Sequence, residues 1–369
     1  MNNSGNYKAI INDEIKYVNK LIANKEYNKL LLLDQNYELN NKSVSIISSF
    51  LENYKKKNLL QKEKLIIISN FSFQVFSREL INQSIINGIK LEIDFLTISE
   101  MMDEAVIKKY KNKSYSIFLY IDHRDFDSIS SFDNNLIFKS KHLKEIRFFY
   151  NMLIENIKKI KPKSVFLSTA PDVRASEFLN YAENISFSKE NLIKKFNKHI
   201  LKIVSENNFN LIDIYKLASK YGLNNFYDDQ KYLLAKLPFK KEFCIFFNKL
   251  FINLISTKNG KLKKVLVLDL DNTIWGGVIG DDGFENLKLG PDSAEGMAFQ
   301  NFQRVIKNLK DRGIILAISS KNNHDTAMQA FKKNKNMILR EKDFSCIKIN
   351  WDDKAKNIKN ISNELNLSL

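Results

Sequence analysis

The stretch Val265-Leu266-Val267-Leu268-Asp269-Leu270-Asp271-Asn272 decides the fold of the second half of this chain. Its four leading apolar residues predict a strand of a parallel sheet, buried on both faces. Asp269 and Asp271 follow at the carboxyl end, where open α/β sheets bind ligands. Two carboxylates on alternate residues suit a divalent metal, a nucleophile and an acid or base acting on one phosphorylated substrate. An aspartate that only caps the next helix would explain one carboxylate, but not the pattern Asp-x-Asp-x-Thr ending at Thr273.

Two later strand ends in the same half also carry polar residues. A helix over residues 300–310 and a strand over residues 314–318 precede Ser319, Ser320, Lys321 and Asn322. A hydroxyl at such a turn can donate to phosphate oxygens, and a simple helix N-cap explains Ser320 equally well. After a third strand near residues 347–349, Lys354 opens a helix and can place its ammonium over a transferring phosphoryl group. A lysine at this position, taken alone, would indicate only a surface residue. The prediction therefore depends on the order of the three motifs, each of which follows an apolar strand.

The composition limits the class of protein. The 369 residues are 44% hydrophobic and 12% aromatic, which excludes global disorder and predicts two or three domains. The net charge of +16 comes mostly from scattered lysines without a nucleic-acid-binding module, so we expect no nucleic acid but an acidic protein partner. We also expect no membrane span, because no apolar run approaches roughly 20 residues, and no signal peptide. Cys244 and Cys346 make neither a disulfide framework nor a zinc site. These features predict a cytoplasmic protein.

Glycine placement and hydrophobic periodicity divide the chain. Eight of the 11 glycines lie between Gly260 and Gly313, which gives the later region the tight loops of a site. We expect a helical lead-in over residues 1–60, an α/β domain over residues 61–258 and a second α/β domain over residues 259–369. In the first domain, strands over residues 65–69, 116–121, 164–167 and 210–213 alternate with helical patterns such as residues 148–160 and 193–204. Such alternation predicts parallel sheets flanked by helices.

Together these motifs resemble the haloacid dehalogenase (HAD) superfamily, and specifically its FkbH-like branch in subfamily IIIC. The matching blocks are Leu-Asp-Leu-Asp-Asn-Thr-Ile-Trp-Gly-Gly-Val at residues 268–278, Ser-Lys-Asn-Asn at residues 320–323, Asn350-Trp351 and Lys354. Asp-x-Asp alone indicates the superfamily, whereas the Trp-Gly-Gly and Ser-Lys-Asn-Asn blocks narrow it to the branch. The resemblance is strong from residue 261 onward and weaker over residues 232–239.

The resemblance implies an SGNH-hydrolase-like or flavodoxin-like N-terminal domain and a Rossmann-like HAD core. It makes Asp269 the nucleophile and Asp271 the acid and base, with Lys354 as the third catalytic residue. Mg²⁺ would lie between the Asp269 carboxylate and the Asp271 backbone carbonyl. The residues expected to bind the substrate phosphate are Thr273, Ser320, Lys321 and Asn322.

Three departures from the family pattern affect these expectations. The chain stops about where the strand before the acidic fourth HAD motif should begin, so we expect an incomplete core that binds metal weakly. Ser319 stands where many relatives have a cysteine, which argues against a thioester relay there and leaves Cys346 as a small buried side chain. In the N-terminal domain, Ser69 or Ser72 could act as a nucleophile. Residues 227–231 nevertheless lack the histidine of an Asp-x-x-His motif, so we expect docking or substrate positioning, not hydrolysis.

The implied function is Mg²⁺-dependent phosphotransfer. Such an enzyme would dephosphorylate a phosphorylated three-carbon donor such as 1,3-bisphosphoglycerate and load a glyceryl unit onto an acidic acyl carrier protein. This activity belongs to polyketide-like or surface-polysaccharide biosynthesis. Three alternatives remain open: a simple phosphatase of small metabolites, a catalytically impaired scaffold that docks carrier proteins, and, ranked last, nucleic-acid binding driven by charge.

Overall fold

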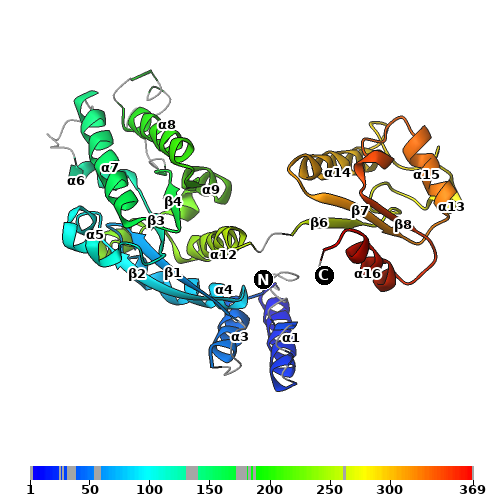
Figure 1. Ribbon diagram of the computed structural model, residues 1–369, viewed down its shortest axis with the longest axis horizontal. Helices are drawn as coiled ribbons and strands as arrows, with labels where there is room; N and C mark the ends of the chain where they lie inside the picture. The colour runs from blue at the N-terminus through cyan, green and yellow to red at the C-terminus, as the bar shows by residue number, and fades with distance from the viewer. Residues whose placement is uncertain are drawn as a thin grey trace. The chain divides into compact units, whose positions relative to one another are not determined.

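The chain forms two compact units, Met1–Gly260 (unit 1) and Lys261–Leu369 (unit 2), drawn in Figure 1. The computed structural model describes residues 3–24, 26, 29–30, 39–53, 60–129, 140–171, 181, 184–185, 188–260 and 263–367. Each unit carries its own parallel sheet flanked by helices, which confirms the predicted α/β class with two domains.

The five strands of unit 1 are all parallel and follow the order β2-β1-β3-β4-β5. This is the order of flavodoxin-like folds, in which the chain reverses its direction of winding between β1 and β3. The strands are β1 (Gln61–Ile68), β2 (Ile89–Leu96), β3 (Ser116–Leu119), β4 (Ser164–Ser168) and β5 (Asn210–Ile212). The central strand β3 is buried along its whole length, because helices cover both faces of the sheet.

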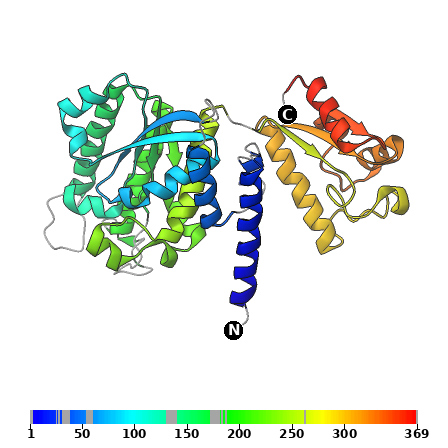
Figure 2. The same ribbon diagram turned by 90° about the horizontal axis from the view of Figure 1, so that it is seen from below.

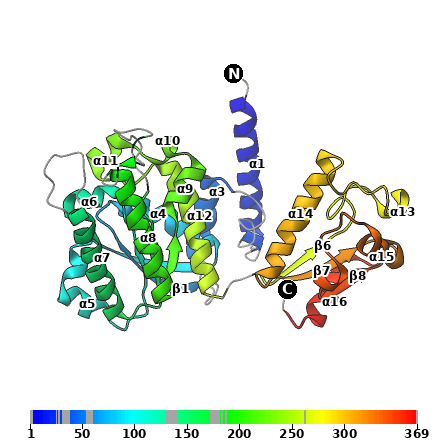
Figure 3. The ribbon, with the colours of Figure 1, turned by 90° about the horizontal axis from the view of Figure 1, so that it is seen from above.

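Helices of unit 1 lie on both faces of its sheet, as Figure 3 shows. The unit contains α1 (Asn3–Ala23), α3 (Asn41–Asn53), η1 (Phe73–Phe76), α4 (Ser77–Ile86), η2 (Glu100–Met102), α5 (Glu104–Tyr110), α6 (His123–Ile129), α7 (Ser140–Ile160), α8 (Lys189–Asn207), α9 (Ile214–Tyr221), α10 (Leu223–Phe226), α11 (Asp229–Ala235) and α12 (Lys241–Lys258). Within the described residues, no helix is both long and apolar enough to cross a membrane.

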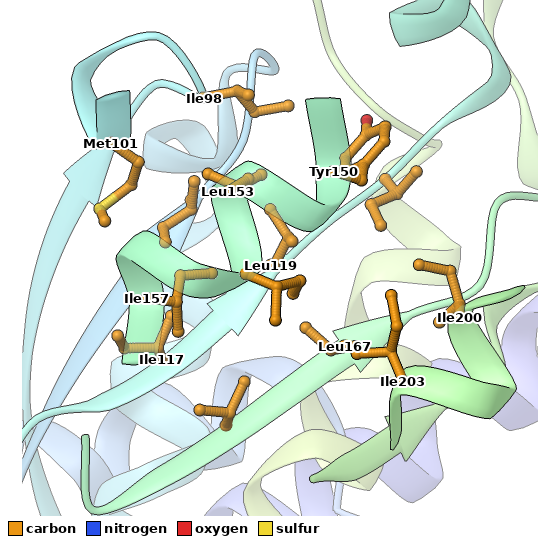
Figure 4. Packing of buried hydrophobic residues seen from close by; sticks show 14 of the residues in the cluster. Ile98, Met101, Ile117, Leu119, Tyr150, Leu153, Ile157, Leu167, Ile200 and Ile203 are labelled. Atoms are coloured by element: carbon orange, nitrogen blue, oxygen red, sulfur yellow. The ribbon is translucent and has the colours of Figure 1, made fainter. Parts of the chain in front are cut away.

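The two faces of the unit 1 sheet bury different side chains. Aliphatic residues of α7 and α8, such as Leu153, Ile157 and Ile200, pack on Ile117 and Leu119 of β3 (Figure 4). The other face is aromatic, and there Phe247 and Phe251 of α12 contact Phe118, with ring centroids 5.6 and 4.9 Å apart. Full burial of each such side chain contributes roughly 1.5–3 kcal/mol, so these contacts dominate the stability of unit 1.

A buried carboxylate joins β1 to the end of unit 1. Glu63, only 3% exposed, accepts hydrogen bonds from Ser116 Oγ at 2.7 Å, Lys163 Nζ at 2.6 Å and Asn259 Nδ2 at 3.1 Å. Asn259 directly follows α12, so this cluster fixes the last residues before the unit boundary. Since a buried charge is tolerated only when it is paired and hydrogen-bonded, the cluster also accounts for the charged residue inside β1.

Unit 2 is a three-stranded parallel sheet with helices on both faces. Its strands, in the order β6-β7-β8, are β6 (Val265–Leu268), β7 (Ile315–Ser320) and β8 (Cys346–Ile349). Its helices are α13 (Ile279–Asp282), α14 (Ala294–Asp311), α15 (His324–Lys333), η4 (Glu341–Asp343) and α16 (Lys354–Glu364). Ile306 of α14 and Phe331 of α15 pack against one face, whereas Ile361 of α16 packs against the other. Figure 2 gives a second view of α14 and α16 about the sheet.

The prediction that β6 is a fully buried strand is wrong for three of its four residues. Val265, Leu266 and Val267 are half-buried, and only Leu268 is buried. The physical reason is the strand order, because among the described strands β6 pairs with β7 alone and therefore lies at an edge. An apolar run can thus occupy an edge position, although its sequence is typical of a central strand.

Asp343 ties α14 to the segment before β8. Its carboxylate is 1% exposed and accepts hydrogen bonds from Lys307 Nζ at 2.5 Å, Lys310 Nζ at 2.9 Å and the Arg340 backbone N–H at 2.9 Å. Burial alone would raise its pKa, but the hydrogen bonds from Lys307, Arg340 and Lys310 outweigh burial and lower the pKa to about 2.

We predict that Asp343→Asn destabilises unit 2 by about 2 kcal/mol at neutral pH, since one pKa unit corresponds to about 1.4 kcal/mol. The carboxylate has a lower pKa in the folded state than the ordinary 3.8. Its contribution is therefore complete above that value and is lost as the pH falls toward 2. Urea unfolding followed by tryptophan fluorescence reports on unit 2, because both tryptophans, Trp275 and Trp351, lie there.

The matched control is Asp311→Asn, which removes an exposed carboxylate at the end of the same helix. It should change the free energy of unfolding by less than about 0.5 kcal/mol. Equal effects of the two substitutions, or a wild-type advantage over Asp343→Asn that is undiminished near pH 2, would contradict this account.

Candidate active site of unit 2

The carboxyl ends of β6, β7 and β8 bring the predicted catalytic residues together. Lys354, the first residue of α16 after β8, places its Nζ 2.5 Å from Asp269 Oδ2 after β6. Ser320, the last residue of β7, is 2% exposed, and its hydroxyl lies near enough to the same carboxylate to lower the pKa of that carboxylate. The three side chains come from three strands and converge because parallel strands end at one edge of their sheet. The predicted order of motifs thus describes one physical site.

Asp269 is held in its charged form. Partial burial would raise its pKa, but hydrogen bonds from Lys354, from Ser320 and from the Leu270 backbone N–H at 2.8 Å outweigh burial and lower the pKa. The Asp269 side chain is 37% exposed and that of Lys354 is 45% exposed. An ionised carboxylate that solvent can reach, next to an ammonium, is suited to attack an electrophile that carries negative charge.

Asp271 is bound by a separate set of donors. Its Oδ1 accepts from Trp275 Nε1 at 3.0 Å and from the Ile279 backbone N–H at 3.1 Å, and its Oδ2 accepts from Asn322 Nδ2 at 2.9 Å. Ile279 is the first residue of α13, so Asp271 also satisfies one N–H at the start of that short helix. The helix-capping alternative is therefore partly right for Asp271. The other two hydrogen bonds that Asp271 accepts come from side chains and have no part in capping.

The remaining predicted residues divide into those near the carboxylates and those pointing elsewhere. Asn322 is 5% exposed and bridges Asp271 and Ser320, with its Nδ2 also 3.3 Å from Ser320 Oγ. Lys321 is exposed. Thr273 lies in a turn. It also lines an open hollow together with Ala298, Phe299 and Phe302 of α14. Direct phosphate binding by Thr273, Lys321 and Asn322 remains a prediction. Asn322 in addition has a hydrogen-bond partner within the protein, which is Asp271.

Ser320 is not a helix N-cap. The N-cap of α15 is Asn323, whose side chain accepts from the Thr326 backbone N–H at 3.2 Å. The capping alternative for Ser320 is therefore wrong, because the chain continues for three residues between the strand and the helix. Its hydroxyl is directed to Asp269, which leaves the phosphate-binding interpretation standing.

The Trp-Gly-Gly loop is shaped by close packing. Gly277 has a φ of +101°, and a Cβ there would lie 2.6 Å from Asp282 Oδ2. Asp282 Oδ2 accepts from the Val278 backbone N–H at 2.8 Å, and Gly277 N–H donates to Asn272 Oδ1 at 3.0 Å. A Cβ on Gly276 would lie 2.7 Å from a ring carbon of Phe299. Gly277 thus has a backbone conformation that favours glycine, and a Cβ at either position would displace a neighbouring side chain.

The donors at this site suit a hard divalent cation. The available atoms are carboxylate and hydroxyl oxygens, whereas both cysteines are buried away from it, Cys244 in α12 and Cys346 in β8. No group of three histidine, cysteine or acidic side chains that could hold a metal is present in the described residues. Mg²⁺ commonly uses one or two carboxylates with waters and substrate phosphate. Asp269, whose side chain is 37% exposed, therefore fits such an ion as a protein ligand.

Cys346 is a small buried side chain, as predicted. It is 3% exposed, and burial together with the nearby Glu364 raises the pKa of its thiol to about 11. The thiol is therefore neutral at physiological pH and unreactive as a nucleophile. Ser319 is also buried, and its hydroxyl has no hydrogen-bond partner among the described residues.

The carboxyl edge of the unit 1 sheet carries a polar cluster of a different kind. Arg124 donates to both oxygens of the fully buried Asp122 at 2.8 Å, and its guanidinium lies 4.0 Å from the ring centroid of Tyr232. Ser69, one of the two candidate nucleophiles, is 6% exposed, and its Oγ accepts from the Phe71 backbone N–H at 3.0 Å. Asp228 caps α11 instead of pairing with a histidine. These contacts pair the polar side chains of this edge with neighbouring groups. That unit 1 does not act as a hydrolase stays a prediction.

Comparison with known proteins finds similarity to solved structures. No protein-family model matches the chain, and no curated protein matches it. Among solved structures, it is similar to the N-terminal part of the protein BF1531 from Bacteroides fragilis, which contains a phosphatase domain and was crystallised in complex with Mg. The TM-score is 0.77 at 27% identity, and the match covers 89% of this chain and 86% of that one. The similarity spans both units and agrees with the two-domain α/β fold.

We predict that Gly277→Ala destabilises unit 2 by about 1–3 kcal/mol, because alanine is strained at this positive φ and its Cβ would collide with Asp282. The matched control is Gly280→Ala, since a Cβ at Gly280 meets no atom within 4 Å. Thermal unfolding followed by tryptophan fluorescence measures both variants. An unfolding temperature for Gly277→Ala that equals that of Gly280→Ala would show that the loop tolerates a side chain.

Proposed function

We propose that unit 2 is an Mg²⁺-dependent phosphatase or phosphotransferase of the HAD type, with Asp269 as the group that takes the phosphoryl group. The observation that carries this proposal is the convergence of Lys354, Ser320 and Asp269 at one sheet edge, beside a second carboxylate with its own donors. The magnesium-bound phosphatase domain of the similar structure supports it. Phosphoryl transfer depends mainly on positioning and charge stabilisation, and this set of residues supplies both.

The reaction proceeds in two steps. In the first, an Asp269 oxygen forms a bond to phosphorus, the bond to the leaving oxygen breaks, and that oxygen takes a proton from Asp271. In the second, Asp271 accepts a proton from water, whose oxygen attacks phosphorus and releases inorganic phosphate with the Asp269 carboxylate restored. Lys354 and Ser320 bind the phosphoryl oxygens throughout. Bound Mg²⁺, held through Asp269, would neutralise charge on those oxygens.

We further propose that the donor is a phosphorylated three-carbon acid such as 1,3-bisphosphoglycerate and that its glyceryl unit passes to an acyl carrier protein. Asp269 takes the ester phosphate, which water then releases as inorganic phosphate. The carrier thiol attacks the C1 acyl carbon, so that a thioester bond forms as the bond to the C1 phosphate breaks and that phosphate leaves. The exposure of Asp269 and Lys354 supports a substrate or partner that approaches from solvent. The net charge of +16 favours an acidic partner by electrostatic steering. FkbH-like carrier loading and a role in biosynthesis rest on the motifs of residues 268–278 and 320–323.

We predict that the protein releases phosphate from small phosphate esters in Mg²⁺ and that Asp269→Asn abolishes this release, because an amide cannot act as the nucleophile. Chelation of the metal should have the same effect, and added Mg²⁺ should reverse it. A colorimetric phosphate assay measures the rates. The matched control is Asp325→Asn, since the Asp325 side chain is 97% exposed and, among the described residues, pairs with His324. Phosphate release that survives Asp269→Asn would remove Asp269 as the nucleophile.

We predict a glyceryl adduct on a holo acyl carrier protein incubated with the chain, Mg²⁺ and a system that generates 1,3-bisphosphoglycerate. Intact mass spectrometry of the carrier detects the adduct, which should be absent with Asp269→Asn and with apo carrier that lacks the thiol arm. Phosphate release without any adduct would leave the simple phosphatase. Carrier binding that is unchanged by Asp269→Asn and by metal removal, with neither adduct nor phosphate, would favour the docking scaffold.

A further inference from the structure

Trp275 has a role that its burial alone does not explain. It is fully buried in the core of unit 2, with its ring 5.7 Å from that of Phe331 at an interplanar angle of 69°. A phenylalanine would supply most of that packing. Tryptophan, unlike phenylalanine, also carries an N–H on its ring, and this N–H donates to Asp271 Oδ1 at 3.0 Å. Trp275 thus joins the hydrophobic core directly to one of the two site carboxylates.

The donors around Asp271 are unevenly divided between its two oxygens. A carboxylate has about four lone-pair sites, two on each oxygen. Oδ1 accepts from Trp275 and from the Ile279 backbone, so both of its sites are filled. Within the part of the chain that the structure describes, Oδ2 accepts from Asn322, which leaves one site open. The open site is therefore on the oxygen at the Oδ2 position, and the two bonds to the other oxygen hold the plane of the carboxylate.

We propose that Trp275 is a positioning residue that fixes the Asp271 carboxylate so that Oδ2 is the oxygen that exchanges a proton with the leaving group and with water. This inference rests on the proposed function, because it gives the acid and base of that reaction a defined atom. Asn322 contributes from the other side, since it bonds both Oδ2 and the Ser320 hydroxyl. The orientation of Asp271 is thereby linked to the residue expected to bind phosphate.

Two substitutions separate positioning from packing. Trp275→Phe removes the N–H but keeps an aromatic ring against Phe331, and Asn322→Ala removes the donor to Oδ2. The matched control is Trp351→Phe, because Trp351 is 75% exposed and is the other tryptophan of the chain. Urea unfolding confirms that each variant is folded, with Trp351 as the fluorophore in Trp275→Phe.

The deciding measurement compares kcat/KM for two phosphate esters in Mg²⁺. An alkyl phosphate such as glycerol phosphate needs a proton on its leaving oxygen, whereas p-nitrophenyl phosphate has a leaving group stable without one. Since general acid catalysis contributes about 10²–10⁴-fold, Trp275→Phe should lower kcat/KM for the alkyl ester about tenfold or more. The value of kcat/KM reports only the first transfer, and in that transfer the p-nitrophenyl leaving group needs no proton. The effect of Trp275→Phe on kcat/KM for p-nitrophenyl phosphate should therefore be less than about threefold. Asn322→Ala should show the same selectivity, and Trp351→Phe should change neither rate.

Equal losses for both esters would show that Trp275 acts only through packing, and no loss for either would also overturn the proposal. A second readout does not depend on activity. In the Trp351→Phe protein, Trp275 is the sole fluorophore of its kind, so adding Asp271→Asn should alter its emission if the indole N–H bonds that carboxylate. An unchanged emission would overturn the contact. Wild-type protein inactive toward both esters, with the emission change present, would instead contradict the proposed function while leaving the contact intact.

Discussion

The separate bonding of the two site carboxylates is the constraint on which the rest of unit 2 depends. A carboxylate that is partly buried needs charged or hydrogen-bonding partners. The fold supplies them by giving the two groups different neighbours. Asp269 lies next to Lys354 and Ser320 at the other two strand ends, whereas Asp271 is bonded by Trp275, Ile279 and Asn322. The strand order, the glycine loop and the start of α16 all serve this separation.

Much of the fold could be predicted from the sequence because its pattern is local. Strands such as β3 and β4 are short apolar runs, and α14 and α16 start where a capping residue precedes a helical pattern: Ser293 accepts from the Gly296 backbone N–H, and Asp353 from that of Ala355. The meeting of Asp269, Ser320 and Lys354 also follows from local signals, since each ends or follows a parallel strand. What made that prediction possible is that parallel strands align their carboxyl ends regardless of the loops between them.

The features that the sequence did not predict depend on contacts between distant residues. Asn322 was predicted to bind phosphate, yet its side chain reaches back to Asp271, 51 residues earlier. The bond from Trp275 to Asp271 spans only four residues, and a tryptophan soon after Asp-x-Asp is a signal that could have indicated it. Asp343 and Glu63 have charged neighbours along the chain, as exposed residues commonly do. The neighbouring sequence therefore gives no sign that both side chains are buried. The edge position of β6 depends on pairing partners, which a single strand's composition does not specify.

The edge position of β6 among the described strands has a consequence for how copies of this protein behave together. An edge strand presents backbone groups to any other strand that approaches, and a half-buried Val-Leu-Val run adds apolar attraction. The surplus of lysine opposes such an approach, because a net charge of +16 makes the copies repel one another. This protection weakens as salt rises, since charges are screened beyond about 10 Å at 0.1 M ionic strength. The lysine-rich composition thus opposes association of the copies in dilute buffers. In concentrated salt this opposition is lost.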